Sequence, residues 1–205
     1  MTTGVTPVPG ANARDGRIRG WFRWMNTGGH KTMLMLFLIV VLSHWAEHIA
    51  QAIQIYLLGW PIPEARGVLG IPFPWLISSE WLHYAYAVVM LVGFIVLAPG
   101  FTGRSRTWWN VALGIQVWHH IEHLLLLGQA VLGVTIAGRA VPTSLVQLIV
   151  PRVELHLIYN SLVFVPMVMA MFHHRYPLRR ERKHMACGCA VPVAPSTRPR
   201  PASAS

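Results

Sequence analysis

Hydrophobic positions gather in four long runs along this chain, and polar positions gather between the runs and at both ends. Each run is about 20 residues or longer, the length that an α-helix needs to cross the hydrocarbon core of a bilayer. Proline and glycine separate the runs, as at Gly59-Trp60-Pro61 and Pro99-Gly100. The pattern therefore predicts four transmembrane helices, at about residues 32–58, 79–98, 107–132 and 151–172.

The composition predicts an all-α integral membrane protein, because 54% of the residues are hydrophobic, 12% are charged and the mean hydropathy is +0.45. The net charge of +10 comes mostly from the two ends. Basic residues also lie in the turn between the second and third runs, so the positive-inside rule places both termini in the cytoplasm. We expect a multi-pass protein of the inner (cytoplasmic) membrane, with no folded basic face for nucleic acid.

The same pattern divides the chain into three parts. Residues 1–30 are an N-terminal cytoplasmic or interfacial segment, and Ile18 to Met25 favour a short amphipathic stretch on the membrane surface. Residues 31–175 form the four-helix membrane domain. Residues 176–205 form a disordered basic cytoplasmic tail, which carries a histidine and the two cysteines of the chain. These side chains form either a weak soft-metal site or an unstructured thiol segment: His184, Cys187 and Cys189.

A polar motif occurs twice inside the apolar runs. His44-Trp45-Ala46-Glu47-His48 lies in the first run and His119-His120-Ile121-Glu122-His123 in the third, and both have the form H-x-x-E-H. On a helix the two outer histidines and the glutamate fall within an arc of roughly 100°. Ionisable groups inside a membrane are costly and usually face a partner, a cavity or a metal. Each motif therefore predicts three metal-binding groups on one helix face.

A second motif, L-H-x-x-Y, follows each of these. It begins at Leu82 in the second run and at Leu155 in the fourth, so the chain resembles two repeated hairpins. At ~1.5 Å per residue, the paired histidines lie ~18 and ~24 Å from the cytoplasmic start of their spans. The histidines of the second motif lie ~6–8 Å below the outer ends of theirs. All six histidines are therefore expected in one slab of the outer half of the bilayer.

Six imidazoles and two carboxylates at matching depth are about the number of ligands that two metal ions need. The predicted ligands are His44, Glu47, His48, His83, His119, Glu122, His123 and His156. Further ligands, or groups that orient the ligands, are expected among Glu80, His120, Gln51, Tyr86, Tyr159 and Asn160. Iron is favoured over zinc or copper, and haem ranks below these ions. No residue is assigned a catalytic role.

Two families carry similar motifs. The H-x-x-x-H spacing of His44/His48 and His119/His123 resembles the histidine boxes of membrane fatty-acid desaturases and hydroxylases, which implies a di-iron site and a lipidic substrate. The H-x-x-H-H box of those families is absent here. H-x-x-E-H also resembles the inverted zinc-peptidase motif, which implies zinc held by two histidines and a glutamate base. Both resemblances cover the motifs alone.

The sequence therefore favours a membrane oxidoreductase or oxygenase with a dinuclear metal site, acting on a lipid-soluble substrate. No nucleotide or flavin fingerprint is present, so electrons would come from a partner protein or a quinol. A b-type haem electron carrier is the second hypothesis, and it leaves the two glutamates unexplained. A metal or proton transporter, a membrane zinc hydrolase and a purely structural hydrogen-bonded bundle are the remaining alternatives.

Overall fold

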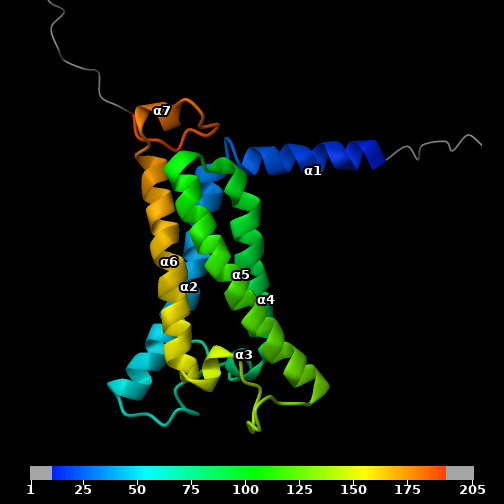
Figure 1. The fold of residues 1–205 in the computed structure, drawn as a ribbon, viewed down its shortest axis with the longest axis vertical. Coiled ribbons are helices and arrows are strands. Elements are labelled where there is room, and N and C mark those ends of the chain that lie inside the picture. The colour runs from blue at the N-terminus through cyan, green and yellow to red at the C-terminus, as the bar shows by residue number, and fades with distance from the viewer. Residues whose placement is uncertain (1–10, 193–205) are drawn as a thin grey trace, which may run out of the picture.

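Long antiparallel helices make up most of the chain (Figure 1). In the computed structural model, which describes residues 11–192, these are α2 (His30–Tyr56), α4 (Glu80–Leu97), α5 (Gly103–Leu132) and α6 (Arg152–Arg175). The shorter elements are α1 (Ala11–Met25), α3 (Trp75–Ser78), α7 (Arg179–Arg182) and two 3₁₀ turns, Ala98–Gly100 and Val146–Leu148. Residues 1–10 and 193–205 lie outside the described part of the chain.

Each of the four predicted spans overlaps one long helix. Within the described residues, three helical segments are long and apolar enough to cross a membrane: α2, α4 with its 3₁₀ extension to Gly100, and α6. At 30 residues α5 is longer than these. Its sequence carries histidines, glutamines and a glutamate along with its apolar residues, which lowers its hydropathy. The predicted all-helical fold is therefore confirmed over the described residues, and the three candidate spans are consistent with a membrane protein. The four-span topology and the side of each terminus stay predictions.

The long helices close into a ring in which each one packs against two others. α5 packs against α4 and α6, and α2 packs against the same two helices. α1 lies across the bundle axis at one end, where α7 also lies, and α3 lies at the opposite end (Figure 1). Because α1 exposes Ile18, Trp21 and Phe22, it suits the membrane surface that the sequence predicts for this segment.

The half of the bundle nearest α1 and α7 has an apolar core. Phe94, Trp109 and Met167, from α4, α5 and α6, are fully buried there. The Trp109 indole N–H donates a hydrogen bond to the Phe94 carbonyl oxygen at 2.8 Å, so the polar atom of this large side chain is satisfied. The other half of the bundle contains the six histidines of the two motifs.

The tail departs from its predicted disorder, because residues 176–192 pack against the bundle. α7 lies in this segment, and the Val191 N–H donates to the Arg175 carbonyl oxygen at 2.9 Å. Glu181 on α7 makes an ion pair with Arg104 at 3.2 Å. The buried Glu181 carboxylate thus neutralises part of the basic charge of this region, which helps the segment to pack against the bundle. The rest of the predicted tail, 193–205, lies outside the described residues.

Candidate metal centre

The six histidines of the two motifs converge between the four long helices, in the half of the bundle nearer α3. They are His44 and His48 on α2, His83 on α4, His119 and His123 on α5, and His156 on α6. The ring of His156 lies in the middle, with its centroid 4.7 Å from that of His48 and 5.4 Å from that of His123. The ring of His83 lies 6.2 Å from that of His123. Side chains far apart in the sequence therefore share one site.

Within each motif the two histidines meet through the same atoms. His44 Nε2 and His48 Nε2 lie 3.2 Å apart, and His119 Nε2 and His123 Nε2 also lie 3.2 Å apart. The ring planes are nearly perpendicular in both pairs, at 85° and 86°. Residues four apart on a helix lie one above the other, which explains why the spacing produces this contact twice.

Hydrogen bonds at Nδ1 fix three of the rings. His83 Nδ1 lies 3.0 Å from the Ser79 carbonyl oxygen, and His156 Nδ1 lies 2.7 Å from the Arg152 carbonyl oxygen. A carbonyl oxygen only accepts, so Nδ1 carries the proton and Nε2 keeps a free lone pair. His48 Nδ1 makes a similar contact, at 2.9 Å, with Gln51 Oε1. In a metal-binding histidine one ring nitrogen binds the ion, and the other usually donates a hydrogen bond that fixes the orientation of the ring.

Both motif glutamates hold loops rather than other helices. The Glu47 carboxylate accepts the backbone N–H groups of Val68 and Leu69, at 2.8 and 3.2 Å. The Glu122 carboxylate accepts the Ser144 hydroxyl at 3.1 Å and the Val146 N–H at 3.0 Å. These contacts satisfy the hydrogen-bonding capacity of both carboxylates without a metal. The glutamates are therefore also explained as anchors of the loops, which is an alternative to their predicted role as metal ligands.

Two glutamines support the same loops, and sequence reasoning missed them. Gln54 bonds to both the N–H and the carbonyl oxygen of Gly67, at 2.8 and 3.0 Å. Gln129 bonds in the same way to Thr143, at 3.3 and 2.9 Å. Each glutamine lies one heptad beyond its motif glutamate, on the same helix face. That equal spacing was the signal in the sequence that could have revealed them.

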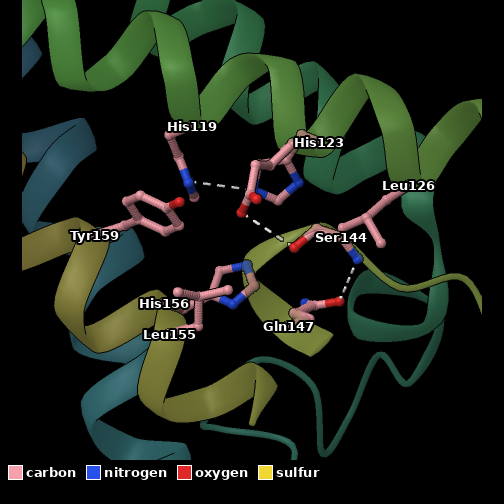
Figure 2. A pocket seen from close by; sticks show the side chains of 9 residues that line it. His119, His123, Leu126, Ser144, Gln147, Leu155, His156 and Tyr159 are labelled. Atoms are coloured by element: carbon pink, nitrogen blue, oxygen red, sulfur yellow. Dashed lines mark hydrogen bonds between the residues drawn. The ribbon is translucent and has the colours of Figure 1, made fainter. Parts of the chain in front are cut away.

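The space beside the two histidine pairs differs greatly. A pocket of about 290 Å³ lies beside His44, His48 and His83, and its remaining lining combines three leucines with polar side chains: Leu69, Leu76, Leu82, Ser43, Glu47, Gln51 and Tyr86. Beside His119 and His123 the cavity is about 10 Å³, close to the size of one water molecule. Figure 2 shows how Ser144 and Gln147 from the loop approach the histidines on that side.

The other predicted side chains have different surroundings. Glu80 makes an ion pair with Arg152 at 2.8 Å, so its carboxylate is engaged outside the histidine cluster. Glu154, on the same helix as Arg152, accepts the Tyr56 hydroxyl. Both motif tyrosines touch the histidines: the Tyr86 ring stacks on that of His44 at 4.0 Å, and the Tyr159 ring lies 4.7 Å from that of His119.

Several buried polar atoms at this site have no hydrogen-bond partner within residues 11–192. Three belong to the central rings: His119 Nδ1, His123 Nδ1 and His156 Nε2. His120 Nδ1 and Asn160 Nδ2 share this condition at the edge of the site. Buried polar groups are normally satisfied, so a cluster of such atoms is a signature of a site that holds a ligand or water.

A separate group of possible metal ligands, His174, Cys187 and Cys189, lies at the other end of the bundle. Over the described part of the chain, this is the trio whose ligand atoms all lie within 4.8 Å of one another. The central histidines instead form close pairs. The sequence had suggested His184 as the companion of the cysteines, but His184 is exposed and His174 takes that place.

Comparisons of the chain with protein-family models, curated proteins and solved structures found no match.

Proposed function

We propose that this protein is an integral membrane metalloprotein that binds two transition-metal ions through its six central histidines. We propose further that it is an oxidoreductase acting on a lipid-soluble substrate. The observation that carries the proposal is the pair of Nε2–Nε2 contacts at 3.2 Å, one on α2 and one on α5. Two imidazole nitrogens bound to one tetrahedral ion at 2.0–2.1 Å stand about 3.3 Å apart. Each pair is thus spaced as two ligands of one ion.

The neighbouring helices offer the further imidazoles, His83 on α4 and His156 on α6. Among the described residues neither has its ligand atom within 4.8 Å of both nitrogens of a pair, so each ring would move towards its pair when the metal binds. His83 Nε2 and His156 Nε2 have free lone pairs, because Nδ1 of each ring is bonded to a backbone carbonyl. His156 Nε2 is also buried without a partner among the described residues. Three histidines per ion leave an open coordination position in a tetrahedral site, which is the usual arrangement of catalytic metal centres.

The proposed ligand set is made of neutral imidazoles. Imidazole suits iron, copper and zinc, and only iron and copper have the redox chemistry that an oxidoreductase needs. We favour iron because the H-x-x-x-H spacing of the two pairs resembles the histidine boxes of di-iron membrane enzymes. The Glu47 and Glu122 carboxylates would then offset part of the ionic charge from nearby while they hold the loops.

The pocket of about 290 Å³ beside His44, His48 and His83 is our proposed substrate site. Its volume approaches the lower limit for small-molecule sites, and its lining combines apolar side chains with a few polar groups, which is typical of such sites. A quinol suits this environment. Its oxidation releases two electrons and two protons, which dioxygen or a peroxide would accept.

Two alternatives fit the geometry less well. A haem held by facing histidines of different helices would use one ring from each side, which leaves the close Nε2–Nε2 contact within each pair unexplained. A transporter needs a polar route to both sides, whereas Phe94, Trp109 and Met167 fill the other half of the bundle.

Elemental analysis and an absorption spectrum of the purified protein test the proposal. We expect about two iron or copper ions per chain, no haem Soret band, and loss of metal in His156→Ala. His173→Ala is the matched control, because His173 lies on the same helix near its other end and contacts Phe172. A Soret band that is absent from His156→Ala would support the haem carrier. If the purified protein contains no metal, the purely structural hydrogen-bonded bundle is the hypothesis that remains.

A further inference from the structure

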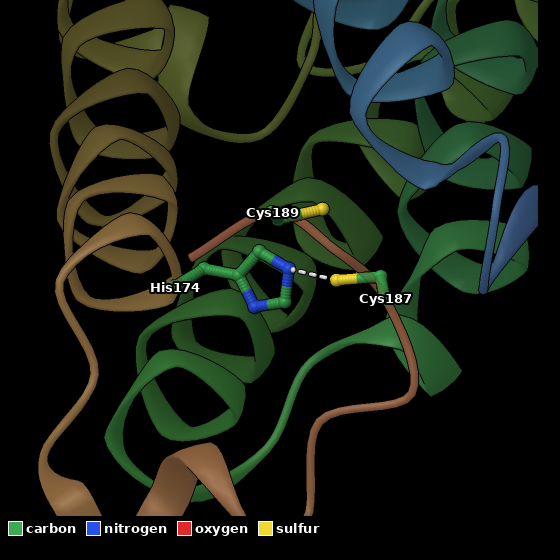
Figure 3. A group of neighbouring side chains, drawn as sticks. All are labelled: His174, Cys187 and Cys189. Carbon is green, nitrogen blue, oxygen red and sulfur yellow. Dashed lines mark hydrogen bonds between the residues drawn. The ribbon is translucent and has the colours of Figure 1, made fainter. Parts of the chain in front are cut away.

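A second cluster of metal-binding side chains lies at the end of the bundle opposite the histidine centre (Figure 3). His174 stands at the end of α6, and the two cysteines belong to the segment that follows α7. His174 Nε2 lies 3.1 Å from Cys187 Sγ, and Cys189 Sγ completes a trio within 4.8 Å. One imidazole and two thiols therefore meet although the chain separates them by a turn, a helix and a loop.

The segment that carries the cysteines is held from both sides. Arg182 donates a hydrogen bond to the Val191 carbonyl oxygen at 2.7 Å, and the Val191 N–H donates to the Arg175 carbonyl oxygen at 2.9 Å. Glu181 joins the segment to the start of α5 through Arg104. These contacts lie on both sides of the cysteines in sequence and limit how far the sulfur atoms can move.

Two members of the cluster are buried and Cys187 is half-buried, and a further histidine lies against them. His174 and Cys189 are 2% and 8% exposed, and His30 at the start of α2 is 0% exposed. The ring of His30 lies 5.1 Å from that of His174. His30 Nδ1 lies 3.1 Å from the Met25 carbonyl oxygen, which leaves its Nε2 with a free lone pair. His30 Nε2 and His174 Nδ1 are buried and lack a hydrogen-bond partner within the described residues.

We propose that His174, Cys187 and Cys189 bind a zinc ion, and that His30, which lies outside this trio, moves in as the fourth ligand. Two cysteines and two histidines are a frequent ligand set of structural zinc sites. Two thiolates balance the charge of the ion, so the buried site carries no net charge. This site joins the start of α2, the end of α6 and the C-terminal segment, and it lies far from the proposed redox centre. Its function is to fix the C-terminal segment to the bundle.

Cobalt provides a probe that reports this cluster alone. Thiolate ligands give bound Co²⁺ a charge-transfer band, and the chain contains two cysteines, both in the cluster. The full-length protein, purified in detergent, is stripped with a chelator under reducing conditions and titrated with Co²⁺. We expect the band to appear and to be removed by one equivalent of Zn²⁺. A wild-type protein that lacks the band would overturn the proposal, whatever metal the histidine centre contains.

Substitutions separate the ligands from their neighbours. The double variant Cys187→Ser/Cys189→Ser should lose the band and keep the metal of the histidine centre. His174→Ala should weaken binding of Zn²⁺ at least ~10-fold, and His30→Ala should do the same. His184→Ala is the matched control, since His184 is exposed on the same segment and should behave as wild type. Equal affinity in His30→Ala would overturn its place as fourth ligand.

Proteolysis of the tail gives a second measurement, which does not depend on the absorption of bound Co²⁺. Cleavage at the exposed basic residues Arg179 and Arg180 should slow on addition of Zn²⁺ in the wild type and remain unchanged in the double cysteine variant. Equal cleavage of the wild type with and without Zn²⁺ would contradict the role in holding the segment. Copper in place of zinc in the protein as purified would overturn the choice of metal.

Discussion

In the first half of the histidine centre, His44 Nε2 and His48 Nε2 lie 3.2 Å apart beside a pocket of about 290 Å³. In the second half, His119 and His123 make the same contact beside a cavity of about 10 Å³. The contact within each pair depends on helical spacing, so it is equal in the two halves. The space beside each pair depends on the loops, which differ in sequence and length.

The loops explain the difference in volume. Glu47 holds the first loop through backbone N–H groups, and apolar side chains such as Leu69 line a wide pocket there. Glu122 holds the second loop partly through a side chain, Ser144, which occupies the space near the histidines together with Gln147. The same helix motif can therefore support an open site in one half and a closed site in the other.

The largest expected effect comes from removing one histidine of either pair. His48→Ala and His123→Ala should each lose about one of the two ions of the histidine centre and fall in stability, because the remaining imidazoles are left buried without a partner. Elemental analysis of the purified variants measures this, with His173→Ala as control. Full metal in both variants would remove these residues from the ligand set. Loss in only one would show that a single half binds metal.

Filling the open pocket tests its role as the substrate site. Leu82→Trp places a larger side chain among the lining residues, so we expect quinol oxidation to fall ~10-fold or more, about 1.4 kcal/mol, while the metal content stays unchanged. Leu162→Trp is the control, because Leu162 is 50% exposed on the outer surface of α6. Equal activity in the two variants would place the substrate elsewhere.

The loop of the first half depends on a glycine. Gly67 has φ of +71°, and a Cβ there would clash with Glu47 Oε2. Gly67→Ala should therefore cost about 2–4 kcal/mol, from backbone strain and from the displaced carboxylate. Gly138→Ala, with φ of +65° and no atom within 4 Å, should cost only the ~1–2 kcal/mol of strain. Thermal unfolding in detergent measures both, and equal shifts would refute the close contact with Glu47.

The glutamates distinguish loop anchors from ligands. Glu122 is 3% exposed whereas Glu47 is half-buried, so Glu122→Gln should cost about 1–2 kcal/mol and Glu47→Gln less. As anchors, both variants should retain their metal. Elemental analysis beside thermal unfolding decides this, and metal lost from either variant would restore the carboxylates to the ligand set that the sequence predicted.

The smallest expected effect concerns Glu181 in the C-terminal tail. Because this residue lies away from both halves of the histidine centre, its substitution serves as a control for their comparison. Burial raises the pKa of Glu181, but hydrogen bonds from Arg104 and from the Leu178 N–H outweigh it and lower the pKa to about 2, from the usual 4.5. The contacts of Glu181 thus stabilise the tail above pH 4.5, and this is lost as the pH falls towards about 2.

Protection of the tail from an acid-active protease should therefore decline over that range of pH. Glu181→Gln should remove the decline and leave both halves of the histidine centre unchanged. A wild-type tail that is equally protected throughout the range would contradict the lowered pKa.

Helical periodicity alone determined much of this molecule. Apolar runs longer than about 20 residues have few alternatives to a helix in a membrane, so the predicted ranges overlap α2, α4, α5 and α6. A rise that is constant along each helix also placed His83 and His156 at the depth of the paired histidines. These features are regular along the chain, which is why the sequence reveals them.

Only the tertiary structure decided which partners the polar side chains took. Glu47 and Glu122 accept N–H groups of loops, Arg152 pairs with Glu80, and His174 displaces His184 beside the cysteines. Each of these partners is set by how a turn or loop folds back onto the bundle, and loops have no periodicity from which a direction can be derived. The sequence by itself therefore determined where the histidines gather, and the folding of the loops decided how much space surrounds them and what the carboxylates hold.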